Sequence, residues 1–128
     1  MKRLTTDNPE GNDSAALNLF YIKDQETWVR GGGSAPDYPD VTLNSWIRGI
    51  IKTYGTDKDT ANLDDEELSG AMSELLFNGT DTIEGVIATL YAAAWAFSTL
   101  RWRLERYENT GLNPEEVAEM KGRMEDWT

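Results

Sequence analysis

Residues 85–100 read GVIATLYAAAWAFSTL and hold no charged side chain, although the chain as a whole has a net charge of -11. The basic cluster Arg101-Trp102-Arg103 follows directly. Because burial of apolar surface is the main favourable term in folding, so apolar a segment must be covered by something. Its own domain, a second copy of the chain and a membrane are the three possible covers, and the choice among them decides the fold.

A membrane is the least suitable cover. A bilayer span requires about 20 predominantly apolar residues, whereas runs of about 10–14 are more typical of core helices. The run here is intermediate in length, is diluted by alanine, threonine, serine and glycine, and has Glu84 at its front. Met1-Lys2-Arg3 continues into polar residues, so we expect no secretory signal. The sequence predicts a soluble protein that makes no membrane contact.

The composition excludes several classes of function. The 128 residues suffice for one domain with a sizeable core. The chain has no cysteine and no histidine, which excludes disulfides and histidine-activated nucleophiles and argues against a zinc site. Its 23 acidic and 12 basic residues argue against direct contact with nucleic acid, which requires a basic surface. We therefore expect a protein that is not an enzyme and that carries no cofactor.

The N-terminal part of the chain is polar and then strand-like. Residues 1–14 are rich in Asp, Asn and Gly, which is typical of an arm that is ordered only where something holds it. Residues 17–22 and 27–30 are separated by a polar turn and predict a β-hairpin. The glycine-rich residues 31–36 indicate a loop. We expect a polar arm at 1–14 and a single α+β domain at 15–128.

From residue 42 onward the pattern is helical. Apolar residues recur at three- and four-residue spacing, which predicts about four helices. Thr42 is placed to cap the first of them, and Gly55 to end it. Asn62 or Asp64 begins a second, shorter helix that ends at Gly79.

The third helix is the long central one. Thr80 or Asp81 caps it, and it extends over residues 82–108, a length of about 40 Å that exceeds what so small a domain needs. Asn113 followed by Pro114 is a strong start for a fourth helix. The apolar residues of this last helix are Val117, Met120, Met124 and Trp127.

The middle of the long helix is apolar on nearly every side. One face consists of Ile83, Val86, Ile87, Leu90, Ala94, Phe97 and Leu104. Tyr91 and Trp95 lie on other sides, and Ala88, Ala92 and Ala96 form a ridge of small residues that a partner helix can approach closely. We expect a homodimer or higher homo-oligomer with this helix at its interface. The alternative is a central helix wrapped entirely by its own chain.

The acidic segment that begins at Asp57-Lys58-Asp59 offers oxygen ligands for a cation. It lacks the glycine and the closing glutamate of a calcium-binding loop. Carboxylates at the start of a helix also stabilise its positive end without any ligand. We expect neither a metal site nor a pair of carboxylates for acid–base catalysis.

Two places in the sequence combine arginine with tryptophan, a pairing that suits the phosphate and the base of a nucleotide. The candidate ligand-binding residues are Trp28, Arg30, Arg101, Trp102, Arg103 and Arg106. The first pair stands before a glycine-rich loop whose spacing is not that of a phosphate-binding motif. The alternative is structural, namely a flexible strand end and basic residues that complement the helix C-terminus and pair with Glu105 and Glu108.

The segment RLERYENTGLNPEEV, residues 103–117, resembles a tail that many small phage and prophage proteins of Gram-positive bacteria share. The tail joins two helices and covers a small part of the chain. The resemblance implies a phage origin and a place in the host cytoplasm. It implies no role for any individual residue.

Three functions remain open for a phage protein of this kind. The first is counter-defence by an oligomeric sponge that sequesters an anionic host nucleotide signal, as the arginine and tryptophan clusters suggest. The second is an acidic inhibitor of a host defence nuclease, such as a CRISPR effector, whose carboxylates take the place of phosphates. The third is a structural or assembly protein of the phage particle. The nucleotide sponge is the preferred hypothesis at this stage.

Overall fold

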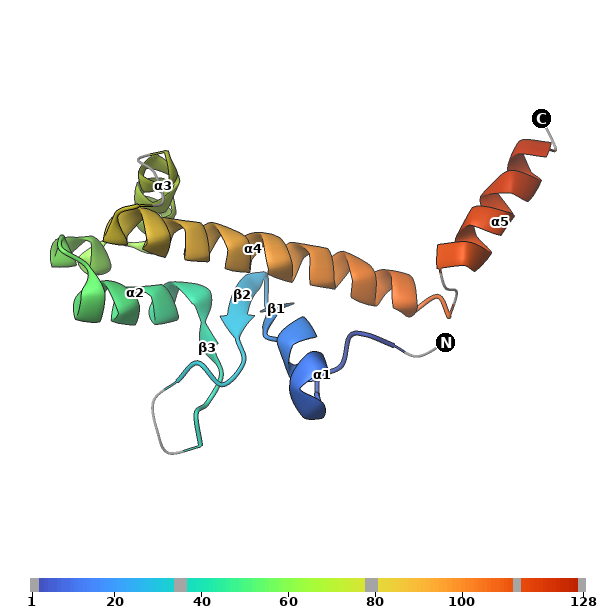
Figure 1. Cartoon of the computed structure of the whole chain (residues 1–128), viewed down its shortest axis with the longest axis horizontal. Helices are drawn as coiled ribbons and strands as arrows, with labels where there is room; N and C mark the ends of the chain where they lie inside the picture. The colour runs from blue at the N-terminus through green and yellow to red at the C-terminus, as the bar shows by residue number, and fades with distance from the viewer. Residues whose placement is uncertain (1–2, 34–36, 78–80, 112–113, 127–128) are drawn as a thin grey trace.

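The computed structural model describes residues 3–33, 37–77, 81–111 and 114–126, and the fold is α+β as expected. A three-stranded antiparallel sheet in the order β1-β2-β3 lies in the N-terminal part, and helices follow it (Figure 1). The elements are α1 (Gly11–Leu17), β1 (Phe20–Lys23), β2 (Glu26–Val29), β3 (Val41–Thr42), α2 (Leu43–Tyr54), the 3-10 helix η1 (Lys58–Asn62), α3 (Asp65–Leu76), α4 (Ile83–Glu108) and α5 (Pro114–Asp126).

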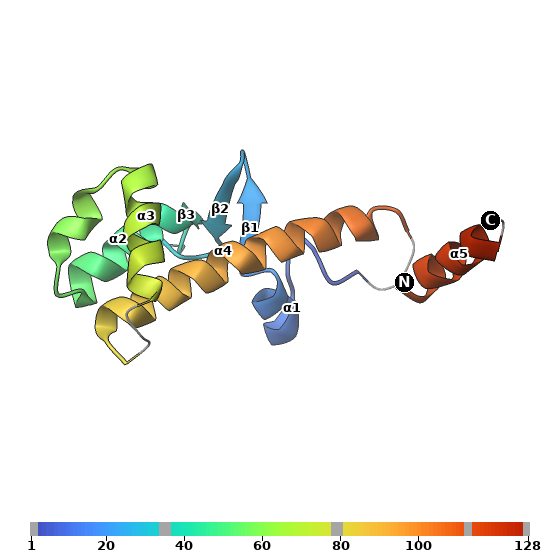
Figure 2. The same cartoon turned by 90° about the horizontal axis from the view of Figure 1, so that it is seen from above.

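Helix α4 is the axis on which the other elements assemble. Helices α2 and α3 pack on its N-terminal half, and the β1–β2 hairpin packs on its middle (Figures 1 and 2). Helix α5 lies beyond the C-terminal end of α4 and apart from the body in both views. The buried apolar core consists of Phe20, Val29, Leu43, Ile47, Ile51, Ala61, Leu68, Met72, Ile87, Ala88 and Ala94.

The predicted hairpin is present, but its first strand begins later in the chain than the sequence predicts. Leu17 belongs to helix α1, and the first strand begins at Phe20. Asp24 and Gln25 form the turn with φ values of 53° and 65°, a conformation that matches the twist of the two strands. Phe20 pairs with Val29, and both side chains are buried. The two-residue strand β3 was not expected, because so short a segment has no alternation to detect.

The predicted polar arm at residues 1–14 is irregular only up to residue 10, because a short helix begins at Gly11. Residues 11–14 are the first turn of α1, a helix with no buried residue, and the sequence pattern therefore carried no sign of it. Thr5 is 3% exposed and lies against the C-terminal half of α4. The arm is held in place by the side chains of Arg101 and Glu108 on α4.

Helices α2 and α3 begin where their capping residues predict. The Thr42 side chain accepts a hydrogen bond from the Ser45 amide, and the Asp64 side chain accepts one from the Glu67 amide. Gly55 follows α2 as expected, but in an extended conformation with φ of -70°. Its amide still donates to the Ile51 carbonyl at 2.8 Å. The expected stop of α3 at Gly79 lies outside the described residues.

Helix α4 has the expected length but a rotated inner face. Thr82 caps it by accepting a hydrogen bond from the Gly85 amide at 3.0 Å, so the expected cap Asp81 is wrong by one residue, and the other expected cap, Thr80, lies outside the described residues. Ile87 and Ala94 are buried as predicted, but Ile83 and Val86 are 49% and 51% exposed. Periodicity locates an apolar stripe, and the packing of α2, α3 and the hairpin decides which part of a wide stripe is covered.

By length and hydropathy, α4 is the one helix in the described ranges that is suited to crossing a membrane. In this fold it is the helix on which α2, α3 and the hairpin pack. Part of its surface stays uncovered, since Trp95 and Leu100 are 59% and 65% exposed.

The C-terminal helix α5 begins at Pro114 and bears acidic residues in its first turn, as the sequence predicts. Its expected cap Asn113 and its expected apolar residue Trp127 lie outside the described residues. Gly111, with φ of +77°, follows the end of α4.

Candidate functional site

Arg30 and Arg101 lie close together although they are far apart in the sequence. Both guanidinium groups lie over the ring of Tyr21, with their Cζ atoms 4.5 Å and 5.9 Å from its centroid. With Lys23 and several acidic residues they line a recess of about 350 Å³ between the hairpin and α4. We call it the arginine recess; its lining residues are Asp7, Tyr21, Ile22, Lys23, Arg30, Arg101 and Glu105.

Arg101 is fully engaged by its own chain. Its Nε donates to Asn18 Oδ1 at 3.0 Å, its Nη2 to the Thr6 carbonyl at 3.0 Å, and its Nη1 to Glu105 Oε2 at 3.2 Å. The side chain is 5% exposed. Because all three nitrogens have partners, Arg101 anchors the N-terminal arm and has little capacity left for a ligand.

Asn18 and Glu108 complete this anchor. Asn18 is fully buried, donates to the Leu4 carbonyl at 2.9 Å and accepts from the Thr6 amide at 2.9 Å. Glu108 accepts from the Leu4 amide at 2.7 Å and from the Thr5 amide at 3.0 Å. Burial alone would raise the pKa of Glu108, but these hydrogen bonds and the charge of Arg3 hold it below its usual value.

Arg30 is engaged only in part. Its Nε donates to the Asn18 carbonyl at 2.9 Å and its Nη1 to the Asp7 carbonyl at 3.1 Å. Its Nη2 is buried and has no hydrogen-bond partner among the described residues. A buried donor without an acceptor is costly, so this nitrogen is the one feature of the arginine recess that favours an added acceptor.

Tyr21 lines the arginine recess and contacts both arginines. Its hydroxyl donates a hydrogen bond to Asp40, which in turn accepts from the Gly31 amide at 2.8 Å. Burial raises the pKa of Tyr21 to about 12, with the Asp40 hydrogen bond adding to the shift. The same hydrogen bonds and the charge of Arg30 hold the pKa of Asp40 below its usual value, although burial acts to raise it. Asp7, Asp40 and Glu105 thus offset the three cations, and the recess has no strong excess of positive charge.

The other candidate residues lie outside the arginine recess. Trp28 is on the same face of the sheet as Tyr21, and its indole nitrogen donates to the Lys23 carbonyl at 3.1 Å. Arg106 stacks on Trp102 at 4.6 Å, and both are exposed on α4. Arg103 is exposed as well. The six predicted residues therefore form no single pocket: Arg30 and Arg101 share the arginine recess, and Trp102 and Arg106 contact each other on the surface of α4.

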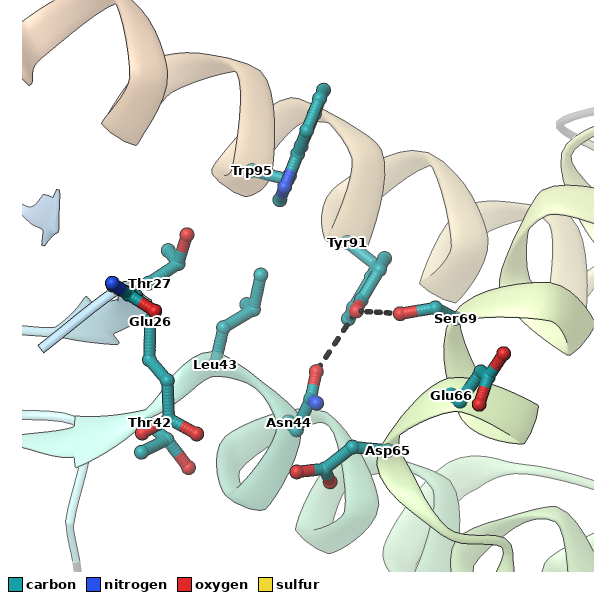
Figure 3. Close-up of a pocket in the computed structure, with 11 residues that line it drawn as sticks. Glu26, Thr27, Thr42, Leu43, Asn44, Asp65, Glu66, Ser69, Tyr91 and Trp95 are labelled. Carbon is teal, nitrogen blue, oxygen red and sulfur yellow. Dashed lines mark hydrogen bonds between the residues drawn. The ribbon is translucent and has the colours of Figure 1, made fainter.

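A second site, which the sequence did not predict, lies where α2, α3 and α4 meet. The Tyr91 hydroxyl donates to Asn44 Oδ1 at 2.8 Å and lies 2.8 Å from the Ser69 hydroxyl (Figure 3). These contacts tie three helices together at the base of a cleft of about 330 Å³. The side chain of Trp95 stands at the α4 side of this cleft (Figure 3).

The cleft has an acidic side and an apolar side. Glu26, Asp65 and Glu66 line the first part. An adjoining recess of about 420 Å³ shares Ser69, Tyr91 and Trp95 with it. Its remaining lining is mostly apolar and comprises Met72, Ser73, Leu76, Ala88 and Ala92. We call the two parts together the Trp95 cleft.

The charges of the Trp95 cleft face solvent. Asp65 receives a hydrogen bond from Arg48 at 2.7 Å, which holds its pKa below the usual value, and its side chain is still 61% exposed. Glu26 and Glu66 are exposed too. One feature of the sequence indicated the Trp95 cleft, since Tyr91 and Trp95 lie outside the predicted apolar face of α4. Nothing in the sequence indicated that α3 would pass close enough to make a cleft of that surface.

A comparison of the chain with protein-family models, curated proteins and solved structures found no match.

Proposed function

We propose that the protein is a non-enzymatic phage protein that acts in the host cytoplasm by binding a basic host defence protein, such as a nuclease. The observation that carries this proposal is the Trp95 cleft, which is open, acidic on one side and apolar on the other. The phage origin rests on the resemblance of residues 103–117.

Charge favours a basic partner. A nuclease that grips nucleic acid presents a basic groove, and the chain has a net charge of -11. Such a field accelerates the encounter of two oppositely charged proteins and repels competing acidic ones. Glu26, Asp65 and Glu66 provide exposed carboxylates where a lysine or arginine of the partner would dock.

The apolar side supplies an anchor. Trp95 is 59% exposed, and tryptophan at the rim of a pocket is among the residues that dominate binding energy at protein interfaces. Met72 and Ala92 line the recess next to it, which suits an apolar side chain of the partner. Because Tyr91 already links Asn44 and Ser69, little ordering of the cleft is required on binding.

The test is capture and inhibition. The tagged chain is used to capture proteins from a lysate of the bacterial host, and the captured nuclease is then purified and assayed with and without the chain. We expect inhibition that weakens as salt rises, and a loss of about tenfold or more in affinity for Trp95→Ala. Trp102→Ala, which removes an exposed tryptophan elsewhere on α4, is the matched control and should leave inhibition unchanged.

Two outcomes contradict the proposal. One is inhibition that is equal for the wild type and Trp95→Ala. The other is inhibition that survives neutralisation of the acidic side by Asp65→Asn and Glu66→Gln. Circular dichroism confirms that each variant is folded before its inhibition is measured.

Sequestration of a host nucleotide is the second candidate, and one observation favours it. The buried Nη2 of Arg30 has no partner among the described residues, and Lys23 lines the same recess. Titration calorimetry with cyclic dinucleotides and ADP-ribose tests it. Binding that is lost in Arg30→Gln but kept in Arg103→Gln supports a nucleotide at the recess, and an absence of heat for every nucleotide removes this candidate.

A further inference from the structure

One side of α4 stays uncovered along most of its length. Its residues follow one another at alternating intervals of three and four positions: Val86, Thr89, Ala93, Ala96, Leu100 and Arg103. We call this the outer stripe. An interval that averages 3.5 residues is the repeat with which one helix follows another in a coiled coil, whereas the packing of α4 on its own domain needs no such repeat.

The outer stripe is mostly apolar and mostly exposed; Thr89 is half-exposed and Arg103 is its charged end. Val86 is 51% exposed and Leu100 is 65% exposed, and Ala93 and Ala96 between them are exposed as well. Large apolar side chains at both ends and small ones in the centre let a second helix approach closely at the middle. The stripe lies on a different side of α4 from Trp95, which is about 100° from Ala96 and about 160° from Ala93 around the helix.

We propose that a second copy of the chain covers the outer stripe, with the two α4 helices antiparallel and crossing at Ala93 and Ala96. The charges along α4 favour a second copy of the chain as the partner and favour the antiparallel orientation of the two helices. In a parallel pair Arg103 would face Arg103 of the second copy, and like charges that meet in an interface are costly. In the antiparallel pair Arg103 faces Val86, and Arg106 faces Ile83, within about one turn of Asp81 of the second copy.

The two orientations also differ in their dipoles. Parallel helices place their positive ends side by side, and antiparallel helices place each positive end beside a negative one. The exposed Asp81 stands before the N-terminal end of α4 and the exposed arginines stand in its C-terminal half, so that the stripe is complementary to itself when reversed. This self-complementarity is what a two-fold symmetric interface requires.

Oligomeric state is the first test. Analytical ultracentrifugation of the full chain should give a dimer, and Ala96→Glu should weaken its association by about tenfold or more, because it places a carboxylate at the closest approach. Ala118→Glu makes the same change at an exposed position of α5 and should leave the dimer intact. A wild type that stays monomeric up to its solubility limit overturns the proposal. If that monomer binds vesicles of phosphatidylcholine, a membrane covers the outer stripe instead of a second copy, and the proposal is overturned as well.

Cross-linking is the second test. Because the chain has no cysteine, an introduced cysteine can form a disulfide only with another introduced cysteine. In the antiparallel pair Leu100 faces Thr89 of the second copy. A mixture of Leu100→Cys and Thr89→Cys should therefore form a disulfide-linked dimer on mild oxidation, and Leu100→Cys alone should not. Efficient cross-linking of Leu100→Cys alone indicates a parallel pair and overturns the proposal. Both variants change exposed or half-exposed positions, and thermal melting verifies that they fold.

Discussion

The arginine recess and the Trp95 cleft are both lined by charged side chains beside α4, but they use their charges differently. In the recess, Arg101 bonds to three groups of its own chain and is 5% exposed. In the cleft, Asp65 pairs with Arg48 and is still 61% exposed. A cluster of charge in the sequence therefore does not reveal whether the charge holds the fold together or remains available to a partner.

Replacement of Arg101 gives the largest expected effect. Arg101→Ala leaves Asn18 and the Thr6 carbonyl without their donor at a buried position. We expect a loss of about 3 kcal/mol in the free energy of unfolding, measured by urea denaturation. Arg103→Ala, at an exposed position of the same helix, should change it by less than about 0.5 kcal/mol. Equal effects of the two variants would remove the distinction between the recess and the surface.

The base of the Trp95 cleft gives the next effect. Tyr91→Phe removes the hydroxyl that joins Asn44 to Ser69 across three helices. We expect a loss of about 1 kcal/mol in the free energy of unfolding. The control is Tyr54→Phe, because Tyr54 is 67% exposed. If Tyr91→Phe is as stable as the control, the hydroxyl does not fasten the cleft.

The attachment of the arm should depend on pH through Glu108. Its pKa in the folded chain is lowered from 4.5, so the stability that it contributes is present above that value and is lost as the pH falls through the lowered pKa. The wild type should melt at a higher temperature than Glu108→Gln at neutral pH, and the difference should shrink in acid. A difference that stays constant with pH contradicts the assignment of Glu108 as the ionised anchor.

The smallest effect concerns Tyr21. Its pKa is raised to about 12 from 10.0, by burial first and by its hydrogen bond to Asp40 second. Asp40→Asn should bring the pKa part of the way back towards 10.0, because the neutral amide removes a negative charge but not the burial. Titration of the Tyr21 ring by NMR measures this, and Asp24→Asn on the hairpin turn is the control. An unchanged pKa in Asp40→Asn contradicts the role of the carboxylate.

Local sequence rules predicted much of the fold. Thr42 and Asp64 cap the helices that they were expected to cap, since a capping side chain bonds to backbone only three residues away. The long helix ends at Glu108, as the stop signal after it predicts. Helix α1 and strand β3 were missed, because the first buries no residue and the second is too short for a pattern.

The sites were harder to predict than the helices. Arg30 and Arg101 were selected as separate candidates, and only the packing of the hairpin on α4 placed both over Tyr21. Asn18 is fully buried, yet nothing in its neighbourhood in the sequence distinguishes it from the asparagines of the polar arm, Asn8 and Asn12. The Trp95 cleft depends on the approach of α3 to α4, which no spacing within either helix encodes.

The sequence by itself determined that the fold is α+β, that one long apolar helix runs through it, and that histidine- and cysteine-dependent chemistry is excluded. These properties follow from residue types and from periodicities along one element. The tertiary structure decided which face of α4 is covered, which arginine is hydrogen-bonded within its own chain, and where an open cleft remains. Those properties depend on contacts between segments far apart in the chain, because a side chain is free or engaged only with respect to what packs against it.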